Sequence, residues 1–114
     1  MKQQLFVKER NCLKKIDLNE IYYFSTVGNK IIAFTIDSSI ELAVSSLNYL
    51  NELLSNNSSN FFRCHKSFII NLNKIDCISK FNNKTYNISF KDIKNQVYIT
   101  QKNLKNLKEK ISII

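Results

Sequence analysis

The sequence contains no proline, no tryptophan, one glycine and one histidine among its 114 residues. A single glycine excludes a glycine-rich phosphate-binding loop. The three cysteines, Cys12, Cys64 and Cys77, are odd in number and include no Cys-x-x-Cys pair, which argues against a disulfide framework and a zinc site. We therefore expect each cysteine to behave as a small buried hydrophobe, and we expect no metal and no cofactor.

Long apolar runs are also absent. No stretch approaches the ~18 residues of a membrane span, and the first residues lack the apolar segment of a signal peptide. The length suits one domain, and no low-complexity tract or internal repeat divides it. We therefore expect a single domain over residues 1–114, located in the cytoplasm and not bound to a membrane.

Acidic residues are outnumbered, with 9 Asp and Glu against 17 Lys and Arg and a net charge of +8. Such an excess favours an anionic partner, with nucleic acid first and an acidic membrane surface second. The alternative is a solvated basic surface that has no specific partner. Charge alone does not decide between these possibilities.

Residues suited to catalysis are few. The one histidine, His65, follows Cys64, and neighbours on a strand point to opposite faces, so these two side chains do not form a nucleophile–base pair. The carboxylates are scattered and show neither metal-ligand spacing nor an acid–base pair. We therefore expect no enzyme activity, and we interpret His65 as a hydrogen-bonded structural residue.

Alternating apolar residues and short turns predict a mainly β domain with antiparallel pairing. The eight or nine expected strands cover residues 4–9, 11–17, 21–26, 30–36, 40–44, 61–67, 76–81, 84–90 and 96–100. The pair Gly28-Asn29 predicts a tight hairpin, because both residues tolerate a positive φ.

Leucine spacing predicts two helices. The first covers residues 45–54, with Ser45 or Ser46 as its N-cap, and a polar connector follows at residues 55–60. The second covers residues 101–111. Its expected buried side carries Leu104, Leu107 and Ile111.

Residues 61–75 combine apolar side chains with a polar cluster. Residues 61–67 alternate as a strand does, but the next three residues are all apolar. The chain must therefore change direction or wind into a helical turn near residues 66–68. Such a bend would present Lys66 and Ser67 outward while the flanking apolar residues anchor it.

Three predicted bends carry amide, hydroxyl or ammonium groups: Asn29-Lys30, Lys66-Ser67 and residues 100–103. Such groups contact phosphates, and Asn, Gln and Lys also reach base edges in a major groove. If the three bends share one edge of a β scaffold, they could enter DNA grooves without a recognition helix. The alternative is that they are solvated turns on different sides of the protein.

A motif within residues 61–75 closely resembles the signature of LytTR DNA-binding domains: Phe61-x-Arg63-x-His65-x-Ser67, then Ile69-Ile70-Asn71 and Ile75. The preceding aromatic strand, the leucine-rich helix and the basic C-terminal segment match in kind and order. The resemblance implies an elongated, mainly β arrangement of small antiparallel sheets with one or two short helices. It also implies a transcription regulator's effector domain that binds specific double-stranded DNA through loops in successive major grooves.

The chain is particularly similar to agr-type virulence regulators, which use three reading loops. The base-contacting positions implied are Asn29 or Lys30, Lys66 and Lys102. The phosphate-contacting positions implied are Ser67, Thr100, Asn103 and Lys105, together with Arg63, which could instead pair within the domain. Lys replaces the usual Asn or Arg at two reading positions, and Asn or Lys replaces a His, which leaves the operator open.

The resemblance further implies partners. Such domains bind paired direct repeats, bend the DNA and follow a receiver domain that a sensor kinase controls. No receiver domain lies within these residues, so the chain is either an excised domain or a stand-alone regulator. The alternative function is a basic β module for RNA or another polyanion, and a structural dimerisation domain is a third. Tyr22, Tyr23 and Phe24 fall in core patterns, which disfavours the stacking platforms of single-strand binders.

Overall fold

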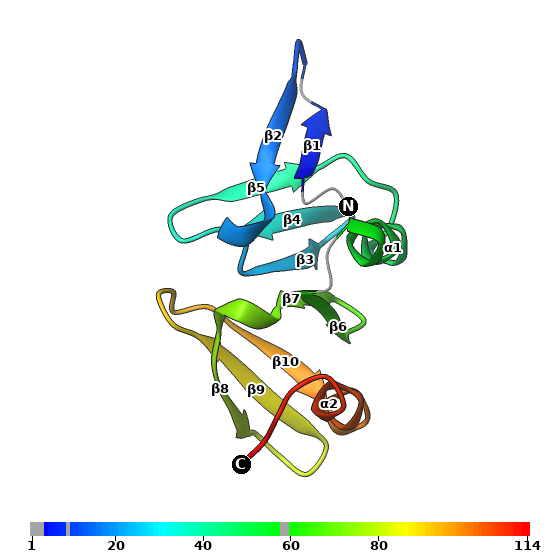
Figure 1. The fold of residues 1–114 in the computed structure, drawn as a ribbon. Coiled ribbons are helices and arrows are strands. Elements are labelled where there is room, and N and C mark those ends of the chain that lie inside the picture. Colours follow the sequence, from blue (N-terminus) through cyan, green and yellow to red (C-terminus); the bar gives the residue numbers. More distant parts are fainter. Residues whose placement is uncertain (1–3, 9, 58–59) are drawn as a thin grey trace.

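The protein is elongated, 47 × 31 × 26 Å along its principal axes. The computed structural model describes residues 4–8, 10–57 and 60–114. Figure 1 shows three sheets that follow one another from top to bottom of the view, with both helices on the same side. The predicted architecture, mainly antiparallel sheets with two short helices, is confirmed.

The elements are short throughout. The strands are β1 (Gln4–Lys8), β2 (Leu13–Asp17), β3 (Tyr23–Val27), β4 (Lys30–Phe34), β5 (Ser39–Leu42), β6 (Phe61–His65), β7 (Phe68–Asn71), β8 (Ile75–Lys80), β9 (Thr85–Phe90) and β10 (Gln96–Thr100). The α-helices are α1 (Leu47–Asn57) and α2 (Gln101–Lys108), and the 3-10 turns are η1 (Leu18–Glu20) and η2 (Leu72–Lys74).

A five-stranded sheet in the order β5-β4-β3-β7-β6 forms the centre of the molecule. The β1–β2 hairpin and α1 lie against one of its faces, and the sheet β10-β9-β8 with α2 lies against the other. Neighbouring residues therefore enter different cores. Phe24 and Ile69 belong to the first core, whereas Tyr23 and Ile70 belong to the second. Both faces of the central strands are buried.

This burial on both faces explains the one strand that sequence patterns miss. Residues 68–71 form β7, which pairs with β3 on one side and β6 on the other. Ile69, Ile70 and Asn71 are all buried, so the strand shows no apolar–polar alternation. The expected bend near residues 66–68 is a tight turn that starts a strand, and the helical turn comes later, at η2.

Helix α1 is longer at its C-terminal end than predicted. The Ser46 side chain caps its start by accepting a hydrogen bond from the Tyr49 backbone N–H at 3.1 Å, as the sequence suggested. Its last turn includes residues predicted as connector, and the Ser55 hydroxyl donates to the Asn51 carbonyl at 2.9 Å. Ser55 and Asn56 in this turn are exposed, so these polar side chains interrupt no packing.

Helix α2 is shorter than predicted. Leu104 and Leu107 are buried as expected, but the helix ends at Lys108 and Ile111 is 38% exposed beyond it. The Lys110 backbone N–H bonds to the Leu107 carbonyl at 2.8 Å, three residues back. This 3-10-type closure ends the α-helical ladder.

The expectation of three buried cysteines is wrong for two of them. Cys64 is fully buried in the second core, whereas Cys12 and Cys77 are exposed. Cys77 lies on β8, an edge strand, and Cys12 precedes β2, so both have a solvent side. Among the described residues, no helix is long and apolar enough to cross a membrane.

Candidate nucleic-acid interface

The β3–β4 turn presents Asn29 and Lys30 to solvent. Val27 pairs with Lys30, so Gly28 and Asn29 alone make the turn. Gly28 has φ = +64°, and no other described residue has a positive φ, which is the φ pattern of a type II′ hairpin turn. Lys30 Nζ lies 3.4 Å from the Glu41 carboxylate, and both side chains remain more than half exposed.

The β6–β7 turn is held from inside by Arg63. Its Nε donates to the His65 carbonyl at 2.8 Å and its Nη2 to the Lys66 carbonyl at 2.7 Å. Its Nη1 donates to Asn48 Oδ1 at 2.7 Å. The register of the β6–β7 pair shifts between Arg63 and His65, so the guanidinium braces a bulged end of the ladder.

His65 is also structural. Its Nδ1 accepts a hydrogen bond from the Ser67 backbone N–H at 3.1 Å, and its ring lies 5.5 Å from that of Phe68. Burial lowers the pKa of His65, and the charges of Lys66 and Arg63 lower it further. The imidazole is therefore neutral near pH 7 and serves as an acceptor.

Lys66 is the exposed residue of this braced turn. Its carbonyl is bound by Arg63, whereas its ammonium group makes no ion pair with any described residue. The turn is fixed to the central sheet as well, because the Thr26 backbone N–H donates to the Ser67 carbonyl at 3.1 Å. The Lys66 side chain is therefore unpaired within the described chain, while hydrogen bonds from Arg63 and Thr26 hold the backbone of its turn.

The β10–α2 corner is the third predicted bend. Thr100 is the N-cap of α2, and its hydroxyl accepts from the Asn103 backbone N–H at 3.1 Å. The Asn103 side-chain amide donates to the Cys64 carbonyl at 3.0 Å, across to β6. Lys102 and Lys105 point into solvent from the same helix.

The three predicted bends lie at one end of the strands. Strands β3, β6 and β10 all run toward the side on which the helices lie (Figure 1). The β3–β4 and β6–β7 turns line a common hollow of about 420 Å³ together with Arg63 and the first turn of α1. The Asn103–Cys64 bond ties the third corner to β6, two residues before Lys66. Lys102 lies outside the hollow.

The site candidates divide by what their side chains already contact. Asn29, Lys66, Lys102 and Lys105 are exposed and make no side-chain hydrogen bond or ion pair within the described chain. Arg63, Thr100 and Asn103 make the internal bonds given above. The sequence did not point to Asn48, which lies beside the hollow. Its partner Arg63 is 15 residues away, and no local pattern reports such a contact.

Cys64, two residues before Lys66, is buried in the second core. Burial raises the pKa of the Cys64 thiol to about 12, so it is not a thiolate nucleophile. Within the described residues, no group of three or more His, Cys, Asp or Glu side chains could hold a metal ion.

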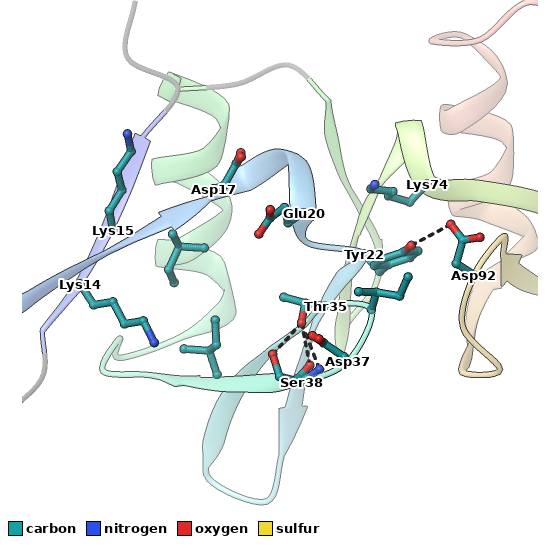
Figure 2. Close-up of a pocket in the computed structure, with 13 residues that line it drawn as sticks. Lys14, Lys15, Asp17, Glu20, Tyr22, Thr35, Asp37, Ser38, Lys74 and Asp92 are labelled. Carbon is teal, nitrogen blue, oxygen red and sulfur yellow. Dashed lines mark hydrogen bonds between the residues drawn. The ribbon is translucent and has the colours of Figure 1, made fainter.

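A second hollow of about 520 Å³ lies at the opposite end of β3 and β4. Figure 2 shows its mixed lining, with Asp17, Glu20, Asp37 and Asp92 among lysines. Tyr22 is one of the lining residues, and its hydroxyl donates to Asp92 at 3.1 Å. Burial first, and then the bond and charge of Asp92, raise the pKa of Tyr22. Four of the nine carboxylates thus gather away from the three basic bends.

A family model described as the LytTr DNA-binding domain matches residues 11–112. The chain belongs to this family. The LytTr assignment confirms the family that the motif in residues 61–75 predicted, and its matched span takes in all three basic corners. The closer likeness to agr-type virulence regulators stays a prediction.

Known proteins similar to this LytTr domain include the transcriptional regulatory protein YpdB of Escherichia coli K12 and of E. coli strain CFT073. Each is 30% identical over 92 residues, which cover 81% of this chain and 36% of the relative. The chain thus spans about a third of the length of these curated relatives. A solved LytTr DNA-binding domain of a putative methyl-accepting/DNA response regulator from Bacillus cereus has the same fold, with a TM-score of 0.78, 21% identity and 96% coverage of both chains.

Proposed function

We propose that this LytTr domain binds specific double-stranded DNA as the effector part of a transcription regulator. The observation that carries the proposal is the joining of three basic corners at one end of the protein. Bonds from Thr26 to Ser67 and from Asn103 to Cys64 hold the corners together. A rigid row of short cationic turns can follow a duplex backbone and reach into its grooves.

The exposed side chains at the tips are the proposed base readers. These are Asn29 or Lys30 in the first corner, Lys66 in the second and Lys102 in the third. Asn and Lys reach donor and acceptor groups on base edges in the major groove. Lys30 would exchange its solvent-exposed pairing with Glu41 for a contact to DNA, and such exposed ion pairs contribute little to stability.

The remaining candidates are the proposed phosphate contacts. Ser67 and Lys105 have side chains available for this role. Thr100 and Asn103 hold their corner internally, so they would reach a phosphate through their remaining hydrogen-bonding capacity. Arg63 keeps one further N–H on each terminal nitrogen beyond its internal bonds, and these two groups are its means of touching a phosphate.

The wider setting follows from the family. We propose binding to paired direct repeats by two copies, with residues 1–114 acting as one non-enzymatic domain in the cytoplasm. A receiver domain and a sensor kinase would control it if it belongs to a response regulator. The YpdB relatives, named transcriptional regulatory proteins and more than twice as long, support that setting.

Selection of bound duplexes from a random pool tests the proposal. We expect one enriched motif, present as a direct repeat, and competition by duplex DNA but not by single strands at fixed salt. Equal competition by RNA or single strands would favour the alternative of a general polyanion-binding module. Tyr22, Tyr23 and Phe24 are buried and cannot serve as stacking faces for single strands, and the exposed aromatic residues Phe81 and Tyr98 lie on the sheet β10-β9-β8 or at its edge.

Removing one lysine charge at each end of the strands tests where DNA binds on the protein. Lys66→Ala should weaken operator binding by about tenfold, whereas Lys14→Ala, at the opposite hollow, should have little effect. Both residues are exposed, so both variants should fold normally. Equal losses in the two variants would mean that net charge alone drives binding.

A further inference from the structure

The Lys66 side chain alone is a poor source of sequence discrimination. An ammonium group on a flexible four-carbon chain acts as a point charge and lacks a fixed hydrogen-bonding fork. Discrimination at this corner must therefore depend on where the backbone holds Lys66. That backbone is gripped by Arg63, whose Nε and Nη2 bind the carbonyls of His65 and Lys66 at 2.8 and 2.7 Å.

The remaining end of the Arg63 guanidinium is held by helix α1. Nη1 donates to Asn48 Oδ1 at 2.7 Å, and Asn48 lies in the first turn of that helix. The helix is anchored in the first core by Leu47, Leu50 and Leu54, which are at most 4% exposed. Because the guanidinium is planar, fixing Nη1 also fixes the direction of the two bonds to the turn. A continuous chain of contacts thus runs from the core to the Lys66 backbone.

We propose that Asn48 is a positioning residue for operator recognition, acting through Arg63 on the β6–β7 turn. This inference rests on the proposed function. Asn48 orients the Arg63 guanidinium, and the guanidinium fixes the carbonyls of His65 and Lys66. These carbonyls in turn fix the point at which the Lys66 side chain leaves the backbone. Loss of Asn48 leaves every cation in place and removes only the restraint, so sequence-specific binding should suffer more than non-specific binding.

Asn48→Ala is the test, with Asn56→Ala as the matched control because Asn56 is an exposed amide on the same helix. We expect Asn48→Ala to weaken binding to the selected operator by about fivefold to tenfold. Binding to a random duplex should change by less than about twofold, since phosphate contacts persist. Equal weakening on both duplexes, or no weakening on the operator, would overturn the inference.

A double-mutant cycle with Arg63→Lys separates positioning from direct contact. Lysine keeps the charge but cannot bridge Asn48 and two carbonyls at once. In the Arg63→Lys background, Asn48→Ala should produce no further loss of operator affinity. If the two losses multiply instead, Asn48 acts independently of Arg63 and the positioning role is refuted.

A measurement without DNA separates failure of this inference from failure of the proposed function. Backbone ¹⁵N order parameters for residues 65–67 should fall in Asn48→Ala and stay unchanged in Asn56→Ala. Unchanged order in both variants would overturn the positioning role even if the domain binds its operator. Absence of duplex binding by the wild-type protein would overturn both conclusions about DNA.

Discussion

Asn103 donates a 3.0 Å hydrogen bond to the carbonyl of Cys64 and thereby joins α2 to the strand that enters the β6–β7 turn. The two residues are 39 positions apart in the chain. A second bond joins the same two parts of the chain, because the Cys64 thiol donates to the Tyr98 carbonyl of β10 at 3.4 Å. Of these two bonds, only the Asn103 amide reaches β6 from the helix that carries Lys102.

Asn103→Ala should lower the free energy of unfolding by about 1 kcal/mol, because it leaves the Cys64 carbonyl without this donor. The N-cap bond survives, since Thr100 accepts from the backbone N–H of residue 103. Operator affinity should also fall, because the corner that carries Lys102 becomes free to shift. Urea unfolding and operator binding measure the two effects. Asn106→Ala, an exposed position on α2, is the control, and equal results in both variants would contradict the bridging role.

Gly28→Ala should destabilise the domain by about 1 kcal/mol. An added Cβ meets nothing within 4 Å, so the effect comes only from the φ of +64° and not from a clash. Asn29→Ala, beside it, has no positive φ and should unfold like the wild type while its operator preference changes. Thermal unfolding of the two variants measures this difference in stability. A Gly28→Ala protein as stable as the wild type would refute the assigned turn geometry.

The domain should lose stability as the pH falls below about 6.5. His65 accepts the Ser67 N–H only when neutral, and burial with two nearby cations lowers its pKa in the folded state. The unfolded chain, with its ordinary histidine pKa near 6.5, then binds the proton more readily than the folded protein. The contribution is complete above that pKa and disappears as the pH drops through the folded-state value.

His65→Gln provides the comparison, because glutamine has an acceptor oxygen but does not titrate in this range. Unfolding free energies measured between about pH 7.5 and pH 5 should decline for the wild type and stay flatter for the variant. Parallel declines would assign the pH dependence to the carboxylates instead.

Lys105→Ala and Lys102→Ala should affect DNA binding in different ways. Loss of a phosphate contact at Lys105 should weaken all duplexes alike and reduce the salt slope of log Kd by about one. Loss of a base reader at Lys102 should relax the preference at one position of the operator. Titrations at several salt concentrations, on the operator and on single-base variants, separate the two. Identical behaviour of both variants would contradict the division of roles.

Local signals in the sequence were sufficient for most elements. Gly28-Asn29 predicted the hairpin because backbone conformation there is dictated by the residues themselves. The bend that presents Lys66 outward and the structural role of His65 also agree with the sequence predictions, and Arg63 makes the internal contacts that were the alternative to a phosphate contact. The family and the mainly β fold agree with the predictions, and the gathering of the basic corners at one end is one of the two arrangements that the sequence left open.

What the sequence missed depends on tertiary contacts. Strand β7 lacks alternation because neighbours cover both its faces, a fact of topology and not of residues 68–71. Cys12 and Cys77 were expected inside, but an edge strand and a hairpin leave them in solvent. Asn48 carried no signal, because its role exists only once α1 lies next to β6.

The central sheet, with a core against each face, has a mechanical consequence. Strands β3 and β6, which lead into two of the turns proposed to read DNA, cannot shift along their axes without disrupting close packing on both sides. In a complex, the DNA and not the protein should therefore change its conformation. Smooth bending of an operator by tens of degrees costs on the order of 1–6 kcal/mol. Operators should accordingly be distinguished by their flexibility as well as by the bases that the lysines are proposed to contact.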